Sequence, residues 1–357
     1  MTHRQFVAAT CALGLTIAVA ALPVRGAGWN PQLAAKYLDE RQREWFAWPQ
    51  AQSPNGPCVS CHTGMPYLIA RPALRRLLKE AQPTMYETGL LDRLRSNAGA
   101  KPAGGLQSVE TIFAALLLPQ GDAAQQATFD QLWALQKKDG ELRGGWQWYS
   151  ANLEPWETPL QFRYGASLAA LAVGSAPATL RNAEQIRGLD DYLQNDVAGR
   201  PLHARIAMLW ASTKLPSIMA PPARQATIDE LLKKQQADGG WSIESLGPWT
   251  EHPDAPVSPA AGASHSYATA FTAFVLKEQL GAREPQLGAV IDQSRARVAE
   301  GASGSANRRM AGGFDEQEVS RRIDAGEVPA GRRDCIRRCG SRARRMRGQA
   351  GSIYRSI

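Results

Sequence analysis

Two cysteines three residues apart, with a histidine directly after the second, carry the clearest chemistry in this sequence. The segment reads GPCVSCHTGMP and places Cys58, Cys61 and His62 together. In the C-x-x-C-H spacing, both thiols can add to the vinyl groups of a haem, and the histidine can bind the iron as an axial ligand. The motif therefore predicts a covalently attached haem c, with Cys58 and Cys61 as attachment residues and His62 as the iron ligand.

Other uses of the cysteine pair stay open at this point. A disulfide between Cys58 and Cys61 would close a very short loop and gain little from loop-closure entropy. A redox-active C-x-x-C usually stands in a βαβ unit, and the surrounding sequence has no such pattern. Zinc needs four ligands, and the next histidine or cysteine along the chain is His203. Haem attachment is the interpretation that uses all three residues of the motif.

The N-terminal sequence favours export, which suits haem attachment because that reaction occurs outside the cytoplasm. His3 and Arg4 precede the apolar run FVAATCALGLTIAVAALPV, and small residues follow up to Ala27. This order is typical of a cleaved signal peptide over residues 1–27, which would also remove Cys11. A retained membrane anchor is the alternative, since the run is near the lower length limit for a span. We expect the mature protein in the periplasm.

The motif assigns no ligand to the sixth iron position. The candidates are Met85, His203, His252 and His265. Met65 is the least suitable methionine, because it lies three residues from His62 on the proximal side. An open sixth position is the further alternative, and it would favour small-molecule binding or oxygen chemistry over simple electron transfer.

The remaining chain predicts an all-α protein. Asn30 and Pro31 are good helix-start residues before QLAAKYLDERQREWFAW, and RPALRRLLKEAQ from Arg71 repeats that pattern. No stretch alternates apolar and polar residues as a strand would. Four later segments share an apolar stripe with small residues between its members, and the repetition predicts paired helical units: Val109/Phe113/Leu116, Tyr164/Leu168/Leu171, Leu202/Ile206/Leu209 and Tyr267/Phe271/Phe274.

A second repeated element stands at two expected helix ends. LWALQKKDGELRGGWQW contains Gln136 and Trp146, and LLKKQQADGGWSI contains Gln235 and Trp241. In each, we expect the glutamine in the last helical turn and a left-handed glycine that ends the helix. The tryptophan ring should then fold back onto the helix and bury a large apolar area.

These residues resemble the repeats of the squalene–hopene cyclase and prenyltransferase superfamily. The family's Q-x-x-x-G-x-W element matches loosely from Gln136 to Trp146 and closely from Gln235 to Trp241. The resemblance implies an α/α toroid of paired helices with a cavity for isoprenoid chains. It does not bring the chemistry. GLDD at 188–191 lacks the first aspartate of the cyclases' D-x-D-D motif, and no cysteine between Cys61 and Cys335 could complete the zinc set of the prenyltransferases.

Some aromatic and acidic residues have two interpretations. Interior packing is expected for the following residues, with a sugar or lipid site as the alternative: Trp146, Trp148, Tyr149, Trp156 and Trp249. Glu157 and Glu251 each follow a proline–tryptophan pair, and we expect them to cap helices, with a place at the mouth of the toroid as the alternative. Asp190 and Asp191 are expected on the solvated face of an amphipathic helix.

The C-terminal segment differs in composition from the rest of the chain. Residues 305–357 hold thirteen arginines, no lysine and six acidic residues, so thirteen minus six gives +7 of the chain's formal +8. Such a segment cannot build a core, and we expect a disordered tail. Two origins stay open: a basic arm that makes peripheral contact with a membrane, or a shifted reading frame. We expect no nucleic-acid partner, since an exported haem protein has little use for one.

The sequence thus predicts four regions: a signal peptide over 1–27, a haem-bearing helical segment over 28–103, toroid repeats over 104–304 and the tail over 305–357. The expected role is redox, either electron transfer with an unidentified partner or oxidation of an apolar substrate held in the toroid. One alternative is a non-enzymatic ligand-binding or scaffold protein with a structural or sensory haem. The other is a divergent isoprenoid cyclase.

Overall fold

The computed structural model describes six stretches of the chain, namely residues 30–53, 56–99, 105–149, 155–158, 161–248 and 262–280. The expected signal peptide and the arginine-rich tail lie outside the described residues, as do Trp249, Glu251 and His252. The described chain is mainly helical, which confirms the all-α prediction. None of its helices has the length and apolar character needed to span a bilayer.

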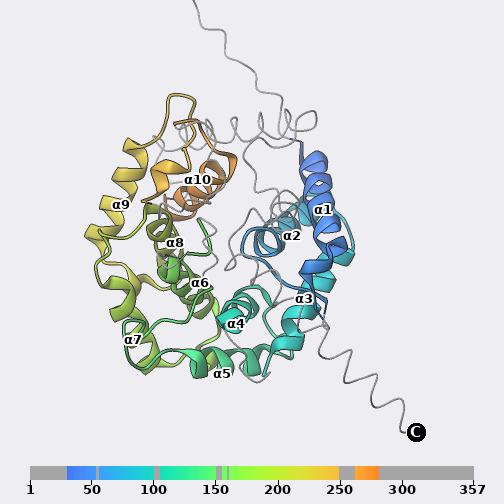
Figure 1. The fold of residues 1–357 in the computed structure, drawn as a ribbon, viewed down its shortest axis with the longest axis horizontal. Helices are drawn as coiled ribbons and strands as arrows, with labels where there is room; N and C mark the ends of the chain where they lie inside the picture. The colour runs from blue at the N-terminus through green and yellow to red at the C-terminus, as the bar shows by residue number, and fades with distance from the viewer. Residues whose placement is uncertain are drawn as a thin grey trace, which may run out of the picture.

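The described residues form ten α-helices joined by loops and short 3-10 turns (Figure 1). The helices are α1 (Pro31–Ala47), α2 (Gly64–Leu78), α3 (Met85–Asn97), α4 (Gly105–Leu117), α5 (Gln125–Leu135), α6 (Phe162–Ser175), α7 (Ala183–Gln194), α8 (Leu202–Ser212), α9 (Pro221–Lys233) and α10 (Ser266–Leu280). Two-residue strands β1 (Gln52–Ser53) and β2 (Gly56–Pro57) pair antiparallel, with Gln52 opposite Pro57. This small hairpin is an exception to the prediction that strands are absent.

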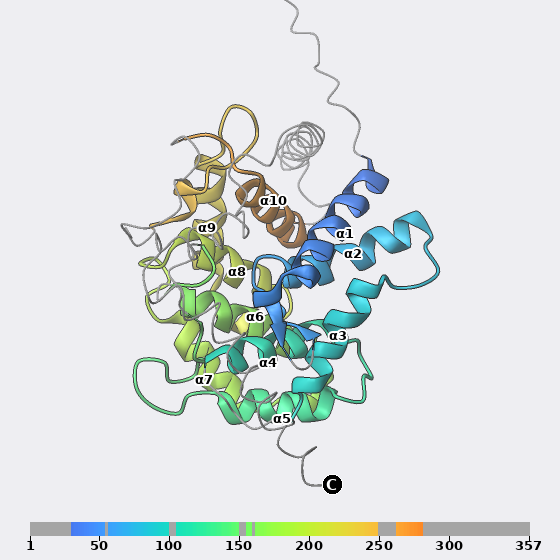
Figure 2. The same ribbon diagram turned by 45° about the vertical axis from the view of Figure 1, so that its right-hand side comes forward.

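The helices alternate between an inner and an outer layer. Helices α2, α4, α6, α8 and α10 contact one another in that order. Helices α1, α3, α5, α7 and α9 lie outside them, and the layers form an arc from α1 round to α10 (Figures 1 and 2). Helices α3 and α4 stand on either side of the boundary expected near residue 103, and they pack against each other. We call Cys58, Cys61 and His62 the haem motif, after the sequence prediction. The segment that carries it is joined to the rest of the described chain through a shared helical interior.

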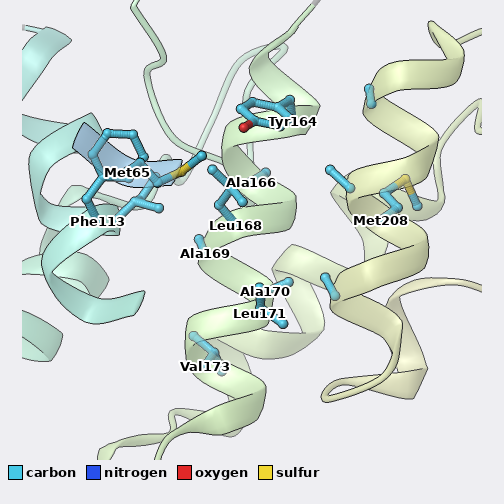
Figure 3. Close-up of a cluster of buried hydrophobic side chains, with 14 of the residues drawn as sticks. Met65, Phe113, Tyr164, Ala166, Leu168, Ala169, Ala170, Leu171, Val173 and Met208 are labelled. Atoms are coloured by element: carbon cyan, nitrogen blue, oxygen red, sulfur yellow. The ribbon is translucent and has the colours of Figure 1, made fainter. Parts of the chain in front are cut away.

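The four predicted apolar stripes fall on α4, α6, α8 and α10, which are all inner helices. Figure 3 shows Phe113, Leu168 and Met208 packed between three of these helices, and each side chain is fully buried. The alanines of α6 allow the close approach of α8 that the sequence indicated. Gly165 on α6 makes room for a loop residue, because a Cβ at this position would lie 2.1 Å from the Trp148 ring.

The repeated tryptophan element is confirmed in its main feature. Both rings fold back onto the preceding helix and are completely buried. The Trp146 indole donates to the Leu132 carbonyl of α5, and the Trp241 indole donates to the Leu231 carbonyl of α9, each at 2.8 Å. A buried indole thus packs its ring and satisfies its N–H group at the same point.

The predicted role of the glycines needs correction. Gly140 and Gly239 do adopt left-handed conformations, with φ of 67° and 83°. However, α5 already ends at Leu135 and α9 ends at Lys233, so the glutamines lie just beyond the helices. Each glutamine holds the following turn instead, because Gln136 Nε2 donates to Gly144 O and Gln235 Nε2 donates to Gly239 O.

One predicted helix start is confirmed and the other is wrong. The Asn30 side chain accepts from the Leu33 N–H at 2.9 Å and caps α1. Pro72 does not open a helix, because α2 begins at Gly64 and contains Pro72 in its interior. Ser60 explains the earlier start, since its Oγ accepts from the backbone N–H groups of both Thr63 and Gly64 at 3.0 Å.

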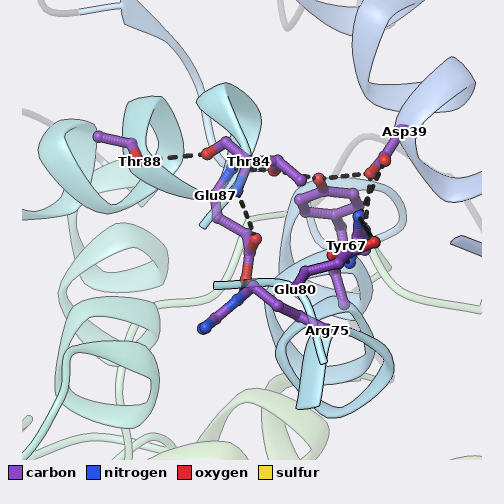
Figure 4. Close-up of polar contacts among 8 residues, drawn as sticks. Asp39, Tyr67, Arg75, Glu80, Thr84, Glu87 and Thr88 are labelled. Carbon is purple, nitrogen blue, oxygen red and sulfur yellow. Dashed lines mark hydrogen bonds and ion pairs between the residues drawn. The ribbon is translucent and has the colours of Figure 1, made fainter. Parts of the chain in front are cut away.

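A polar cluster fixes α1, α2 and α3 relative to one another (Figure 4). The buried Arg71 guanidinium donates to Asp39 on α1 and to Glu80 after α2, at distances down to 2.6 Å. The Tyr67 hydroxyl donates to Asp39 at 2.8 Å and lies 2.7 Å from the Thr84 hydroxyl, which caps α3. The haem motif lies in the loop between α1 and α2, so this cluster determines where that loop stands.

Replacing Trp241 by alanine should reduce the free energy of unfolding by about 3–5 kcal/mol, because it removes a buried ring and leaves a cavity. Chemical denaturation followed by circular dichroism measures the loss. The matched control is Trp210→Ala, which truncates a partly exposed tryptophan of α8 and should cost clearly less. Equal losses in the two variants would contradict the clamp role of Trp241.

Candidate functional site

The haem motif occupies a loop whose backbone is held from several sides. The Cys58 N–H donates to Ala51 O, and the Trp45 indole of α1 donates to Cys58 O, both at 2.8 Å. The Ser60 hydroxyl closes the other end of the loop at the start of α2. The sequence Cys58–His62 is therefore presented on a rigid backbone.

A buried carboxylate on α4 also holds this loop. Glu110 accepts from the backbone N–H of Val59, which directly follows Cys58. It also accepts from Arg93 Nε and Nη2 at 3.1 and 3.0 Å, and from the Asn97 amide. Burial raises the pKa of Glu110, and the Arg93 charge and these hydrogen bonds oppose that rise. Glu110 is the single acidic residue in the mainly apolar α4, and this isolated acid is the sequence signal for its role.

The three motif residues lie close together and face the interior. Both cysteines are in the thiol form; Cys61 is buried and Cys58 is partly buried. The His62 ring lies between two tryptophans, with centroid distances of 6.1 Å to Trp45 and 5.7 Å to Trp156. Its Nδ1 lies 3.2 Å from the Thr63 hydroxyl of its own loop. The imidazole is thus oriented by the rings of Trp45 and Trp156 and by its contact with the Thr63 hydroxyl.

The Glu157 carboxylate lies beside the His62 ring and not at the start of a helix. Its Oε1 lies 4.0 Å from His62 Nε2, and both side chains are nearly buried. The next helix, α6, begins at Phe162 without a side-chain cap. The predicted capping role of Glu157 is therefore wrong. A carboxylate and an imidazole share this position because the Pro155–Thr158 segment folds over the motif.

A hydrogen-bonded cluster continues from Trp156 into the helical interior. The Trp156 indole lies 3.0 Å from the Tyr267 hydroxyl, which in turn lies 2.8 Å from His203 Nε2. His203 Nδ1 lies 3.2 Å from Gln161 Oε1, and the Tyr164 ring stacks on the His203 ring at 4.8 Å. Tyr164, His203 and Tyr267 stand in the first turns of α6, α8 and α10, so three inner helices contribute to one site.

Burial and hydrogen bonding determine which atoms of the cluster carry a hydrogen. Burial lowers the pKa of His203 to about 3, so its imidazole is neutral. Because Gln161 Oε1 is an acceptor, Nδ1 carries the imidazole hydrogen, and Nε2 accepts the Tyr267 O–H. The Tyr267 oxygen accepts the Trp156 N–H in turn. Burial raises the pKa of both Tyr164 and Tyr267, and the nearby Cys61 thiol adds to this effect.

His252 lies outside the described residues, and among the described candidates for the sixth iron position only His203 lies near the motif. Met85 is 70% exposed at the start of α3. Met65 packs in the core beside Phe113, as Figure 3 shows. His265 lies beside Trp241, to whose carbonyl its backbone N–H donates. Both ring nitrogens of His203 are in hydrogen bonds, so binding iron through either nitrogen would break the bond at that nitrogen.

The remaining sequence candidates divide clearly. Trp146 and Trp148 are completely buried, which confirms interior packing, whereas Trp156 contacts His62. Tyr149 is partly buried. Helix α7 is amphipathic as predicted, with Leu189 and Leu193 buried and Asp191 exposed; Asp190 accepts from the Ser217 hydroxyl at 2.9 Å.

The donor set fits a covalently attached haem. Two thiols at the required spacing stand beside an imidazole whose Nδ1 is engaged by Thr63 and whose Nε2 points away from its own loop. The Glu157 carboxylate lies 4.0 Å from Nε2, so a group bound to that nitrogen would share its surroundings with this carboxylate. Cys58 and Cys61 would hold the group and His62 would bind the iron. When bound, the haem supplies one-electron redox chemistry.

The comparisons with known proteins add no assignment. No protein family, curated protein or solved structure matches this chain. Within the described stretches, no group of three or more histidine, cysteine, aspartate or glutamate side chains is arranged to hold a metal ion.

Replacing Glu110 by alanine should reduce the free energy of unfolding by about 3–5 kcal/mol, since it removes the carboxylate that pairs with the largely buried Arg93. It also removes the acceptor of the Val59 N–H. Urea denaturation measures the change. The control is Asp92→Ala, which breaks an exposed pair with Arg95 on α3 and should cost less than about 1 kcal/mol. A loss for Glu110→Ala as small as the control would show that the carboxylate does not anchor the loop.

The lowered pKa of His203 predicts acid-sensitive stability. The unfolded chain takes up a proton near pH 6.5, whereas folded His203 does so only near pH 3. Above pH 6.5 the titration of His203 does not lower the free energy of unfolding. As the pH falls below 6.5, the free energy of unfolding decreases by up to about 1.4 kcal/mol per pH unit. The free energy of unfolding is measured by chemical denaturation between about pH 7 and 4, a range set by these pKa values. When it is plotted against pH, its slope should be shallower for His203→Gln than for the parent protein. Identical slopes would mean that His203 is not a buried neutral imidazole.

Proposed function

We propose that the chain is an exported c-type haem protein that acts in electron transfer. The observation that carries the proposal is the presentation of Cys58, Cys61 and His62 on one anchored loop. The two cysteines form no disulfide in the structure, and the imidazole is oriented by Trp45 and Thr63. Neither a disulfide nor a zinc site makes use of all three residues in this arrangement.

We further propose that the helices form an α/α toroid related to the cyclase and prenyltransferase repeats. Two features support this architecture. Inner and outer helices alternate along the chain, and the two Q-x-x-x-G-x-W-like elements clamp the outer helices α5 and α9 with buried tryptophans. In this proposal the haem motif lies at the end of the ring where the inner helices α6, α8 and α10 begin.

Interior packing favours electron transfer over oxidation of an apolar substrate. The space between α4, α6 and α8 is filled by side chains such as Phe113, Leu168 and Ile206, which have almost no exposed surface. An isoprenoid chain would have to displace them. By contrast, the aromatic contacts that lead away from His62 offer a route for electrons. Substrate oxidation remains the runner-up, with an apolar small molecule as the substrate.

The other two alternatives have less support. For a divergent cyclase, the aspartates of GLDD would have to face the interior, but Asp191 is exposed on the outer helix α7. A non-enzymatic scaffold with a sensory haem shares the same attachment site and differs in its response to ligands. We place the protein in the periplasm, with an unidentified redox partner and with peripheral membrane contact through the arginine-rich tail.

Haem staining after denaturing gel electrophoresis tests the attachment. When it is expressed with its own N-terminus and a c-type maturation system, the parent protein should retain the stain. The variant Cys58→Ala/Cys61→Ala should lose it, because both thioether bonds are removed. The control Cys335→Ala/Cys339→Ala carries the same substitutions at the other closely spaced cysteines and should stain normally. A parent band of normal intensity that carries no haem would refute the proposal.

Visible spectra of the same preparations test the iron ligand and the role. His62→Ala should shift the Soret band, because the proximal nitrogen is lost. Carbon monoxide should leave the reduced spectrum of an electron-transfer protein unchanged, whereas binding would indicate an open sixth position and favour the sensory or oxidative alternatives. An unchanged spectrum in His62→Ala would show that another residue binds the iron.

A further inference from the structure

The hydrogen-bonded phenol and imidazole beside the haem motif are not explained by packing. Tyr267 and His203 place polar groups in the interior, where each must be satisfied by a partner. Apolar residues at these positions would have avoided that requirement. The pair is moreover oriented from both sides, because Gln161 fixes the imidazole and the Trp156 indole donates to the phenol oxygen. Such an ordered arrangement points to a chemical role.

A continuous series of aromatic rings joins this pair to His62. The centroids of His62 and Trp156 are 5.7 Å apart, and those of Trp156 and Tyr267 are 4.8 Å apart. Indole and phenol are the two neutral side chains that lose an electron most readily. Ring contacts this short allow an electron to pass from Tyr267 through Trp156 to the position of His62.

The hydrogen bond to His203 supplies the accompanying proton transfer. A phenol that loses one electron becomes a very strong acid and must release its proton at once. Tyr267 Oη already donates to His203 Nε2 at 2.8 Å, and this nitrogen is the unprotonated one because Nδ1–H points to Gln161. The proton therefore moves along an existing hydrogen bond without any rearrangement.

We propose that Tyr267 is a redox-active tyrosine whose electron leaves through Trp156 toward the His62 position while its proton moves to His203. The oxidant is a one-electron acceptor, which becomes reduced by one electron. The products are a neutral phenoxyl radical at Tyr267 and an imidazolium at His203, and only the Oη–H bond breaks. The haem as the natural acceptor rests on the proposed function, whereas the redox activity of the pair does not.

Another buried phenol provides a comparison. Tyr192 on α7 is buried, but the Arg163 guanidinium lies over its ring at 4.6 Å. A fixed positive charge disfavours loss of an electron from that ring, and no imidazole contact is available to take the proton in the described stretches. Tyr192→Phe is therefore the matched control for Tyr267→Phe.

Pulsed electron paramagnetic resonance after photo-oxidation tests this proposal. The full chain carries Cys58→Ala and Cys61→Ala, so that no haem absorbs the exciting light, and its histidines are labelled with nitrogen-15. A photogenerated ruthenium(III) tris-bipyridine complex serves as the one-electron oxidant, and samples are frozen after the flash. We expect a tyrosyl radical coupled to a histidine nitrogen. Tyr267→Phe should lose this coupled signal, and Tyr192→Phe should retain it.

A variant of Trp156 tests the electron path, and three results distinguish this proposal from its alternatives. Trp156→Leu should reduce the yield of the coupled radical while Tyr267 and His203 remain, because the ring between oxidant and phenol is gone. A parent radical without nitrogen coupling, or coupling that persists in Tyr267→Phe, would overturn the proposal; the first of these needs no folded variant. A coupled radical in a protein that fails the haem-staining test would sink the proposed haem function and leave this inference standing.

Discussion

The hydrogen bonds of the buried Glu110 carboxylate are the interaction on which the candidate site depends. This group joins α4 to Arg93 and Asn97 on α3 and to the backbone of Val59 within the haem motif. Burying a charge is costly unless opposite charge and donors surround it. Here the surrounding groups belong to two separate segments, α3 and the motif loop, so the carboxylate is satisfied only when both pack against α4. The thiols and His62 take their positions from this arrangement.

The same principle extends inward from the motif. Trp156 contacts His62 on one side and donates to Tyr267 on the other, so the surface loop and the inner helices meet through one side chain. His203 and Gln161 then extend this series of hydrogen bonds into the interior, from the Tyr267 hydroxyl to the Gln161 side-chain oxygen. The helices supply rigid starting points for these residues, because Tyr164, His203 and Tyr267 all lie in first turns.

Local signals in the sequence were sufficient for the elements, but not for the contacts between them. The Asn30 cap, the apolar stripes of α4, α6 and α8 and the tryptophan clamps depend on residues close in sequence, and these predictions were correct. The stripe predicted for α10 was wrong in part, because Phe274 is 37% exposed whereas Val275 and Leu276 are buried. The Pro72 prediction failed because hydrogen bonds to the Ser60 hydroxyl start the helix at Gly64, eight residues before Pro72. The proximity of Glu157, His203 and Tyr267 to the motif depends on how distant helices pack, and no local pattern encodes it. Glu110 was visible as an isolated acid among apolar residues, yet its partner Val59 lies fifty-one positions away.

The burial of Cys61 and the fold of Pro155–Thr158 over His62 have a consequence for biogenesis. A haem-attaching enzyme must reach both thiols, but Cys61 is only 3% exposed in the finished fold. The segment that covers His62 comes almost a hundred residues later in the chain. In the proposed function, attachment would therefore have to precede the arrival of that segment. Haem attachment and folding would then follow a fixed order in time, and a chain that folds first would be closed to the proposed cofactor.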